Sequence, residues 1–362
     1  MTDLLADIEE LVRFESPSSD HDAVARSAEL VAAVGRRLLD VEPERIVTDG
    51  CTHLRWRFGD TPKVLLLGHH DTVWPHGSLA THPFSVKDGV LRGPGCFDMK
   101  TGLVMALHAV AALDDRDGVS ILITGDEELG SLRSRALIEE EARGCAAAFV
   151  LEASGPGGAL KTRRKGTSIY RIVVAGKASH AGLEPEKGIN AAIEIAHQIL
   201  AVSALGDAGR GTTVVPTVLS AGTTSNTVPA EAVVSVDVRA WDRDEQVRVD
   251  DAIRRLTPVL DGAQIRIEGG INRPPLDTAS SADLFRLAST LAGELGLGEL
   301  PETAVGGASD GNFTAGVGIP TLDGLGAVGD GAHADHEHVI VEEIPKRTAL
   351  LVALLKAVLG SR

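Results

Sequence analysis

The residues best suited to chemistry lie where a short apolar segment ends. Lys63 to Leu67 is too short for a helix and is followed by Gly68, two histidines and an aspartate. A buried strand with this pattern opens into a site at its carboxyl end. Side chains two apart in an extended chain point to the same side, so Asp71 could hold the His69 ring while its other nitrogen faces a metal. A core strand followed by a polar turn would explain the same residues.

Two acidic segments farther along the chain offer matching ligands. Asp98 follows a glycine-punctuated loop and precedes an expected helix, where it could simply act as the N-cap. Three adjacent carboxylates, Asp126 to Glu128, come directly after an apolar segment. Like charges at the end of a buried strand repel one another unless a cation offsets them, although a solvated acidic turn is the simpler alternative.

Two more segments end in residues of the same kinds. Glu152 follows an apolar run, and His333 begins a histidine-rich segment before the last expected helix, where a surface turn is the alternative. A shared aspartate that bridges two ions, with one histidine and one carboxylate on each, would use His69, Asp98, Glu128, Glu152 and His333. This mixed nitrogen and oxygen set suits two divalent metal ions, with zinc the first choice and cobalt or manganese as substitutes.

The composition narrows the class of protein. A chain of 362 residues exceeds one ordinary core, so we expect two domains. Its net charge of -16 argues against nucleic acid and anionic membranes as partners. Three cysteines without Cys-x-x-Cys spacing suggest reduced thiols in a cytoplasmic protein. The N-terminus lacks a basic region and no run reaches the roughly 18 apolar residues that span a bilayer, so we expect a soluble protein without signal peptide or anchor.

The elements that must position these residues alternate between strand and helix over the first part of the chain. Buried strands are expected at 63–67, 119–124 and 146–151, with helices at 101–113 and 131–141 and covering helices before residue 40. A polar loop at 72–95 separates the first of these strands from the next helix, and loops of this length are usually functional. The pattern predicts an α/β domain with a mixed, largely parallel sheet and helices on both faces.

From about Gly166 the order changes to β-α-β-β-α-β, which is typical of a ferredoxin-like α+β unit. After two consecutive prolines, Pro274 and Pro275, the α/β style resumes. We therefore expect the catalytic metal-binding domain in two parts, 1–165 and 273–362, with a lid and dimerisation domain, 166–272, inserted between them. A basic run at 161–165 could either attract an acidic substrate side chain or form a solvated hinge.

These segments resemble the dinuclear zinc peptidase and aminoacylase family, which includes glutamate carboxypeptidase, acetylornithine deacetylase and succinyl-diaminopimelate desuccinylase. The resemblance spans nearly the whole chain and is nearest to glutamate carboxypeptidase. It rests on the following motifs in the family's order: Gly-His-His-Asp-Thr-Val (68–73), Gly-Pro-Gly-Cys-Phe-Asp-Met-Lys (93–100), Gly-Asp-Glu-Glu-Leu-Gly-Ser (125–131), Gly-Lys-Ala-Ser-His-Ala-Gly (176–182) and Gly-Gly-Ala-Ser-Asp-Gly-Asn (306–312).

The resemblance implies a role for each matching residue. Asp98 would bridge the two ions, Glu128 and Glu152 would bind separate ions, and His69 and His333 would complete the ligand set. His336 and His338 lie in the same segment and are the alternatives for this last ligand. Asp71 would orient His69, and Glu127 would be the general base.

The inserted domain would contribute substrate contacts. His180 resembles the transition-state histidine, which in dimeric members reaches the partner subunit's site. Asn226 and Arg239 resemble the residues that bind a substrate carboxylate, a natural use of a planar donor fork. Gly307 would contact substrate through its backbone, and Asp310 would be a supporting residue.

The resemblance thus implies a metal-dependent hydrolase that cleaves an amide or peptide bond next to a free α-carboxylate, with Glu127 as general base toward a water bridging the metals. Deacylation of an N-acyl amino acid is the alternative within the family. A non-catalytic metal-binding scaffold of the same fold is an alternative of a different class. A serine hydrolase using Ser309 matches the formula Gly-x-Ser-x-Gly but lacks a strand-then-helix context.

Overall fold

The computed structural model describes residues 2–360, and they form two compact units. Unit 1 comprises the chain up to Arg164, Leu276–Val305 and the residues from Ser309 onward. Unit 2 comprises Lys165–Pro275 together with Gly306–Ala308. The inserted segment thus begins one residue earlier than expected and ends three later, because its last strand runs on to Arg273. No helix within residues 2–360 is both long and apolar enough to cross a bilayer.

The central sheet of unit 1 is mixed, as the sequence predicts. Its strands lie in the order β1 (Glu44–Thr48), β2 (Cys51–Arg57), β6 (Val119–Thr124), β3 (Val64–His69), β7 (Ala147–Val150) and β14 (Thr321–Leu322). The pairings from β6 to β14 are parallel, whereas β1, β2 and β6 pair antiparallel. The predicted α/β class, with a largely parallel sheet, is confirmed. Strand β1, a mostly exposed edge strand, lacks the apolar pattern by which the buried strands are predicted.

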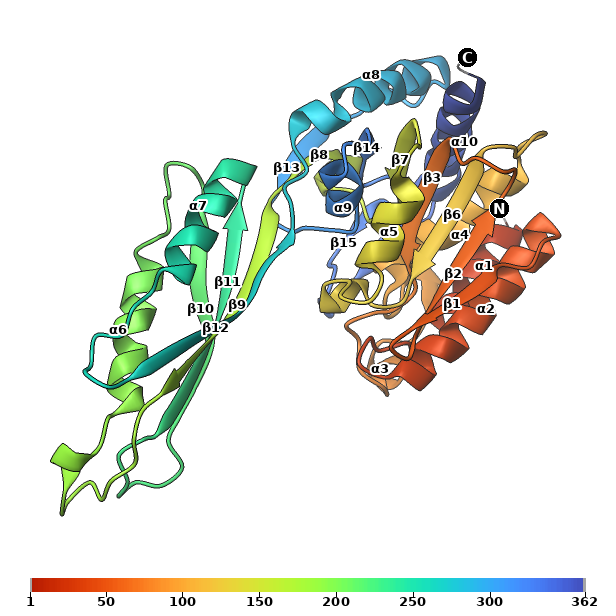
Figure 1. Cartoon of the computed structure of the whole chain (residues 1–362). Helices are drawn as coiled ribbons and strands as arrows, with labels where there is room; N and C mark the ends of the chain where they lie inside the picture. The colour runs from red at the N-terminus through yellow and green to blue at the C-terminus, as the bar shows by residue number, and fades with distance from the viewer. Residues whose placement is uncertain (1, 361–362) are drawn as a thin grey trace. The chain divides into compact units, whose positions relative to one another are not determined.

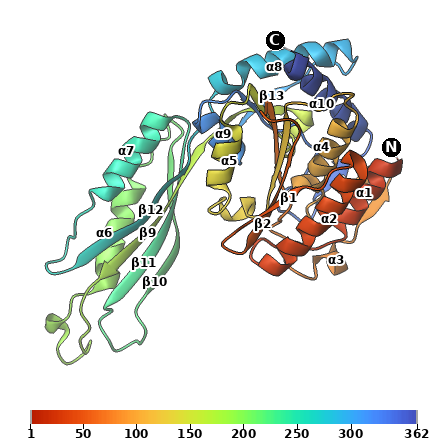
Figure 2. The same cartoon turned by 45° about the vertical axis from the view of Figure 1, so that its right-hand side comes forward.

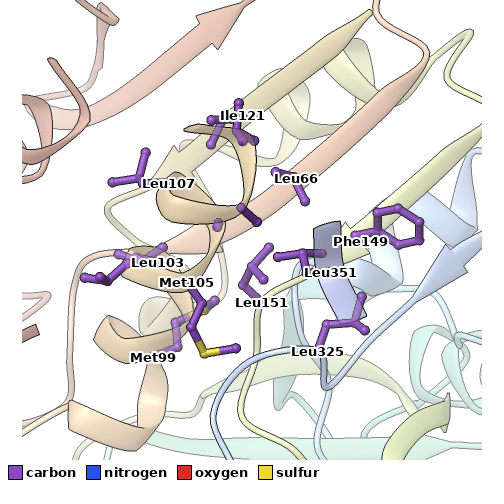
Figure 3. Close-up of a cluster of buried hydrophobic side chains, with 14 of the residues drawn as sticks. Leu66, Met99, Leu103, Met105, Leu107, Ile121, Phe149, Leu151, Leu325 and Leu351 are labelled. Atoms are coloured by element: carbon purple, nitrogen blue, oxygen red, sulfur yellow. The ribbon is translucent and has the colours of Figure 1, made fainter. Parts of the chain in front are cut away.

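Strand β3 shows how the sheet builds a core on each face. Successive side chains of a strand point to opposite faces. Accordingly Val64 and Leu66 join the larger apolar cluster, whereas Leu65 and Leu67 join a separate cluster on the other face. Figure 3 shows Leu66 in the larger cluster, among side chains of neighbouring strands and helices. A strand buried on both faces needs the continuous apolar run that the sequence contains.

Helices cover both faces of this sheet. Figure 2 shows the sheet nearly edge-on, with α5 and α9 on one side and α1, α2 and α4 on the other. The larger cluster takes apolar residues from α1 (Thr2–Val12), α2 (His21–Leu39), α4 (Thr101–Ala111), α8 (Thr278–Glu294) and α10 (Glu343–Gly360). The smaller takes them from α5 (Arg135–Ala142) and α9 (Gly311–Gly316). Asp20 caps α2, accepting hydrogen bonds from the backbone N–H groups of Asp22 and Ala23.

The predicted polar loop at 72–95 is not structureless. It contains the short helix α3 (Ser78–Thr81) and strands β4 (Ser85–Lys87) and β5 (Val90–Arg92). These strands extend a small antiparallel sheet with β16 (His338–Ile340) and β15 (Gly329–Asp330). The strands are two to three residues long, too short for a periodic pattern to reveal them.

Strand β8 (Leu160–Arg164) contains most of the basic run. It pairs in parallel with β13 (Glu302–Val305). Along β8 the side chains alternate between buried and partly exposed, with Arg164 buried. Residues 161–164 of the run therefore form a half-buried strand of unit 1 rather than a solvated segment, and Lys165 begins unit 2.

Unit 2 has the β-α-β-β-α-β order that the sequence predicts (Figure 1). Its elements are β9 (Gly166–Ala175), α6 (Ala191–Ser203), β10 (Thr213–Ala221), β11 (Glu231–Ala240), α7 (Arg243–Arg254) and β12 (Gln264–Arg273). The sheet order β10-β11-β9-β12 is antiparallel throughout. Helix α7 ends at Arg254, four residues before Pro258, which disfavours the helical conformation in the residue that precedes it.

Candidate metal centre

The carboxyl ends of three adjacent strands create the site. β6, β3 and β7 are parallel neighbours, so their carboxyl ends lie at one edge of the sheet. His69 is the last residue of β3, Glu127 and Glu128 lie in the turn after β6, and Glu152 lies two residues beyond β7. Gly68 lets the chain pass close to the next helix, because a Cβ there would come within 2.8 Å of Leu103 and Met99 side chains.

Asp98 faces ligands on both sides. Its Oδ1 lies 3.3 Å from His69 Nε2, and the same His69 nitrogen lies 3.6 Å from Glu152 Oε1. Its Oδ2 lies 3.3 Å from His333 Nε2, which lies 3.2 Å from both carboxylate oxygens of Glu128. The five residues named from the sequence thus form two triads that share Asp98, each with one histidine and one further carboxylate.

The residues fit a pair of divalent cations. His69 Nε2 and Asp98 Oδ1 are buried and make no hydrogen bond, although they face each other. An unpaired buried polar atom is costly, and a shared cation would satisfy both. Ligand atoms of His69, Asp98 and Glu128 lie within 4.8 Å of one another, as do those of His69, Glu127 and Glu152. Histidine nitrogen with carboxylate oxygen is a donor set that zinc accepts.

Crowding of these groups perturbs their titration. Burial alone would lower the pKa of His69, but Asp71, Asp98 and Glu152 raise it well above its usual range. Burial opposes ionisation of Asp98, yet the His333 and His69 rings hold its pKa far below the ordinary value. Burial, with repulsion from Asp98, raises the pKa of Glu128 to about 6. Opposed shifts within one cluster are typical of functional sites.

His333 lies on a loop in an unusual backbone conformation. Its φ is 62°, in the left-handed region that non-glycine residues seldom adopt. Hydrogen bonding to Asp98 and Glu128 raises the pKa of its half-exposed ring to about 10. The neighbouring histidines are placed differently: His338 lies in β16, and its Nδ1 contacts the carbonyl oxygen of His336.

Asp71 contacts both His69 and the turn that contains Glu127 and Glu128. The nearest contact of His69 Nδ1 is the Asp71 backbone carbonyl at 2.9 Å, with the carboxylate at 3.4 Å. The carboxylate itself accepts hydrogen bonds from the backbone N–H groups of Glu127 and Glu128, both at 3.3 Å. Asp71 therefore connects the loop after β3 to the turn that presents Glu127.

Asp126, the first of the three adjacent acids, is directed away from the two triads. Its carboxylate accepts hydrogen bonds from Ser134 Oγ at 2.6 Å and from the Arg133 backbone at 2.8 Å. It lies instead near Cys51 and His53, all three buried. Local hydrogen bonds, rather than a cation, thus stabilise one of the three like charges.

The candidate residues of unit 2 fall at opposite ends of its sheet. His180 follows β9 and is exposed, and the backbone of Ala181 bonds to the Asn226 carbonyl, so these two loops are neighbours. Arg239 lies near the far end of β11, where it pairs with Thr167 at the start of β9. Its guanidinium makes two hydrogen bonds to Asp237, at 2.8 and 2.9 Å. Gly307 lies in an exposed loop after β13.

The His180 ring has a defined donor. Its Nδ1 accepts hydrogen bonds from the backbone N–H groups of Gly182 and Leu183, both at 3.1 Å. In a neutral imidazole the proton must then reside on Nε2, which is left to donate.

Two residues that the sequence did not assign to the metal centre, Arg164 and Glu337, contact its proposed ligands or their loops. Arg164 is buried and forms ion pairs with Asp323 at 2.8 Å and with Glu152 at 3.3 Å. Glu337 is 4% exposed and contacts the Asp98 loop. The basic run was a signal for Arg164, whereas the position of Glu337 depends on a contact across 239 residues, which no local pattern encodes.

The serine hydrolase alternative does not fit the geometry. Ser309 is fully buried, and its hydroxyl donates to Asp323 at 2.5 Å while accepting from the Gly311 backbone at 3.1 Å. Asp310 accepts from Thr124 at 3.0 Å and from the Ser131 hydroxyl. Both side chains support the sheet edge.

Comparisons with known proteins agree with this arrangement. Residues 65–357 match the family described as peptidase family M20/M25/M40. The chain is 30% identical to carboxypeptidase G2 of Pseudomonas sp. strain RS-16, over 96% of this chain and 87% of that protein. It is 27% identical to the succinyl-diaminopimelate desuccinylase of Wolinella succinogenes, over 82% and 85% of the two chains.

Solved structures share the fold. An M20 family metallo-carboxypeptidase from Sulfolobus solfataricus has a TM-score of 0.78 at 18% identity, with 99% of each chain covered. An aminopeptidase from Bacillus cereus has a TM-score of 0.75 at 24% identity, with 98% of each covered. With a family match over most of its length and clustered metal-ligand side chains, the chain belongs to the M20/M25/M40 peptidase family and is a metal-dependent hydrolase of the metallopeptidase and amidohydrolase type.

Proposed function

We propose that this hydrolase binds two divalent ions, preferably zinc, and cleaves an amide or peptide bond next to a free α-carboxylate, as a glutamate-type carboxypeptidase. The observation that carries the proposal is the pair of triads sharing Asp98. The donor atoms of Glu127, His69 and Glu152 also lie within 4.8 Å of one another. The similarity to carboxypeptidase G2 over nearly the whole chain supports a carboxypeptidase. A scaffold without activity would have no need for Glu127 beside a full ligand set.

When bound, the two ions would supply Lewis acidity, polarising the scissile carbonyl and making water more acidic. Glu127 would take the proton of the attacking water and pass it to the leaving amine nitrogen. Its backbone N–H is held by the Asp71 carboxylate, and its side chain is 9% exposed, so the base is both fixed and shielded from bulk water.

Residues of unit 2 would bind the rest of the substrate. His180 would donate its Nε2 proton to the developing oxyanion, as its tautomer allows. Arg239 and Asn226 would bind the substrate carboxylate. Because two N–H groups of Arg239 already face Asp237, the substrate would use the remaining donors or displace that aspartate.

His180 and Arg239 cannot serve one site from a single rigid copy of unit 2. Strand β9 runs ten residues from the end near Arg239 to the end near His180, which corresponds to about 33 Å of extended chain. The inserted segment Lys165–Pro275 joins unit 1 at 164–165 and 275–276, and both of these junctions lie at the Arg239 end. We infer that His180 and Asn226 act in the site of a second subunit, which makes unit 2 a dimerisation as well as a lid domain.

The surface of unit 2 suits such pairing. β10 is an edge strand, with Val215, Val218 and Leu219 at least 48% exposed. On α6, Leu200 is 71% exposed. Exposed edge strands and apolar side chains favour association with another copy.

Deacylation of an N-acyl amino acid is the second candidate. It is favoured by the similarity to succinyl-diaminopimelate desuccinylases, which covers 82% of the chain at 27% identity. Both candidate reactions hydrolyse an amide bond. They differ in the substrate groups on either side of that bond, so a comparison of substrates distinguishes them.

A substrate panel tests the proposal. Peptidyl glutamate should be hydrolysed, whereas the same peptides with the α-carboxylate converted to an amide should react at least about 100-fold more slowly, because the Arg239 ion pair is lost. Hydrolysis of N-succinyl diamino acids with little activity on glutamate compounds would favour the second candidate. Equal rates with free and amidated carboxylates would contradict both.

The metal requirement is tested separately. Prolonged chelation should abolish hydrolysis, and zinc or cobalt should restore it in proportion to the ions bound, with saturation near two per chain. Full activity in protein shown by elemental analysis to be free of metal would refute the proposal.

A further inference from the structure

The side chain of Glu337 connects two of the loops that carry proposed metal ligands. Its Oε1 accepts hydrogen bonds from the backbone N–H groups of Phe97 at 2.8 Å and Asp98 at 3.0 Å. Its Oε2 accepts from the backbone of Gly95 at 2.9 Å and from Trp74 Nε1 at 2.7 Å. Four donors therefore converge on one carboxylate that is 4% exposed.

The backbone N–H groups of the Asp98 loop need a hydrogen-bond acceptor from another part of the chain. Gly95 has φ 70°, and Asp98 has φ -119° and ψ 94°, so the chain is not helical there even though a helix begins at Thr101. The backbone N–H groups of Gly95, Phe97 and Asp98 thus point to the Glu337 carboxylate rather than to a preceding helical turn. Buried backbone donors need such a partner, and a carboxylate is a strong one.

Glu337 is tied to the His333 loop through its own backbone. Its N–H donates to the Ala334 carbonyl at 2.9 Å, and the Ala334 N–H donates to Gly331 at 2.9 Å. These turns flank His333, whose ring faces Asp98 and Glu128. The Glu337 side chain thus holds the loop of Asp98, and its main chain belongs to the loop of His333.

We propose that Glu337 is a positioning residue that sets the separation of Asp98 and His333 and thereby the affinity of the centre for divalent cations. The inference rests on the proposed function, because it assigns these two side chains as ligands. Glu337 would not touch the ions. Residues that orient ligands in this way typically change metal affinity by about 10- to 100-fold.

Two substitutions separate position from charge. In Glu337→Gln the side chain keeps its shape, but its amide NH2 would meet N–H donors at one of the two oxygen positions. In Glu337→Asp the charge remains, but the shorter side chain cannot reach all four donors. Positioning predicts that both variants weaken binding of Zn²⁺ and Co²⁺ by about 10- to 100-fold, measured by competition with a chromophoric chelator. The visible spectrum of bound Co²⁺ should also change in both.

Glu141→Gln is the matched control. Glu141 is also a buried carboxylate with several partners, Arg55, Arg57 and Ser120, but it lies on α5 among residues that carry no proposed ligand. Its substitution should lower Tm while leaving the Zn²⁺ dissociation constant within about twofold of wild type, since its partners do not carry ligands.

Hydrogen exchange of the wild-type protein adds a measurement without any substitution. The amides of Gly95, Phe97 and Asp98 should be strongly protected in the metal-free protein, because the Glu337 carboxylate binds them before any ion does. Exchange at the rate of an exposed loop would overturn the proposal even if the variants failed to fold.

The remaining outcomes are distinct. Wild-type affinity in both Glu337 variants would overturn the positioning role while leaving the proposed function intact. Weakening in Glu337→Gln alone would show that charge, not position, matters, which also overturns it. Failure of the wild-type protein itself to bind divalent ions would instead refute the proposed function.

Discussion

Glu127 and Glu128 are adjacent in sequence, yet their surroundings assign them different tasks. Glu128 lies 3.2 Å from the His333 ring, as expected of a ligand to one ion. The Glu127 carboxylate lies near the side chains of His69 and Glu152, and its backbone N–H donates a hydrogen bond to the Asp71 carboxylate. Because consecutive residues in a tight turn point in different directions, one can bind metal while the other moves a proton.

Substitution of each glutamate by glutamine should therefore give different failures. Glu127→Gln should retain both ions but lose about 10²- to 10⁴-fold in kcat, because the amide cannot accept the proton. Glu128→Gln should lose metal, because an amide is a poorer ligand than a carboxylate. Elemental analysis with kinetics on the same samples checks both. Loss of an ion from Glu127→Gln but not from Glu128→Gln would mean that the two roles are exchanged.

At the scale of elements, the site depends on how closely α4 approaches the end of β7. Gly102 lies in the first turn of α4, and a Cβ there would come within 2.1 Å of the Leu151 carbonyl oxygen. Leu151 directly precedes Glu152, so this contact sets the position of a proposed ligand. Leu151 belongs to the same buried apolar cluster as Leu103 and Met105 of this helix (Figure 3).

Gly102→Ala should thus destabilise the protein although alanine is the better helix former. The clash is with backbone, which cannot move aside cheaply, and overpacking of this kind costs roughly 1–3 kcal/mol. Thermal unfolding should show the lower Tm, and Zn²⁺ binding should weaken because Glu152 shifts. Gly293→Ala is the control: a Cβ there meets nothing within 4 Å, so the helix propensity gain of about 1 kcal/mol should raise Tm slightly. Equal effects of the two substitutions would refute the packing argument.

At the scale of the whole molecule, the proposed action of His180 in a partner's site can be tested by mixing. His180→Ala and Glu127→Gln should each be inactive alone. In a heterodimer, one metal centre would have an intact Glu127 from its own chain and an intact His180 from its partner. Random exchange of equal amounts should restore about a quarter of all sites, because half of the dimers are mixed and each contributes one intact site.

The control for this experiment is a double variant. A chain that carries both His180→Ala and Glu127→Gln should rescue neither single variant, whatever the exchange. Subunit exchange is followed independently with tagged chains. No recovery despite exchange would show that His180 acts within its own chain or not at all, and an active strict monomer would refute the dimer while leaving the metal chemistry unaffected.

The sequence by itself determined the strand ends at which the candidate ligands lie. Continuous apolar runs require strands buried on both faces, and parallel neighbours bring their carboxyl ends together, so local patterns located His69, Glu128 and Glu152. Periodicity likewise predicted the β-α-β-β-α-β order of unit 2. These features depend on residues close together in the chain, which is why they can be recognised without a structure.

Only the tertiary structure decided which neighbouring polar groups serve the centre. It directs Asp126 toward Ser134 and away from the triads, and it buries Arg164 of the basic run between Glu152 and Asp323. It also brings the Glu337 carboxylate into hydrogen-bond contact with the backbone of the Asp98 loop. Each of these outcomes depends on hydrogen bonds or ion pairs between side chains and partners whose direction and distance the local sequence does not encode, because they form only once separate strands and loops have packed together.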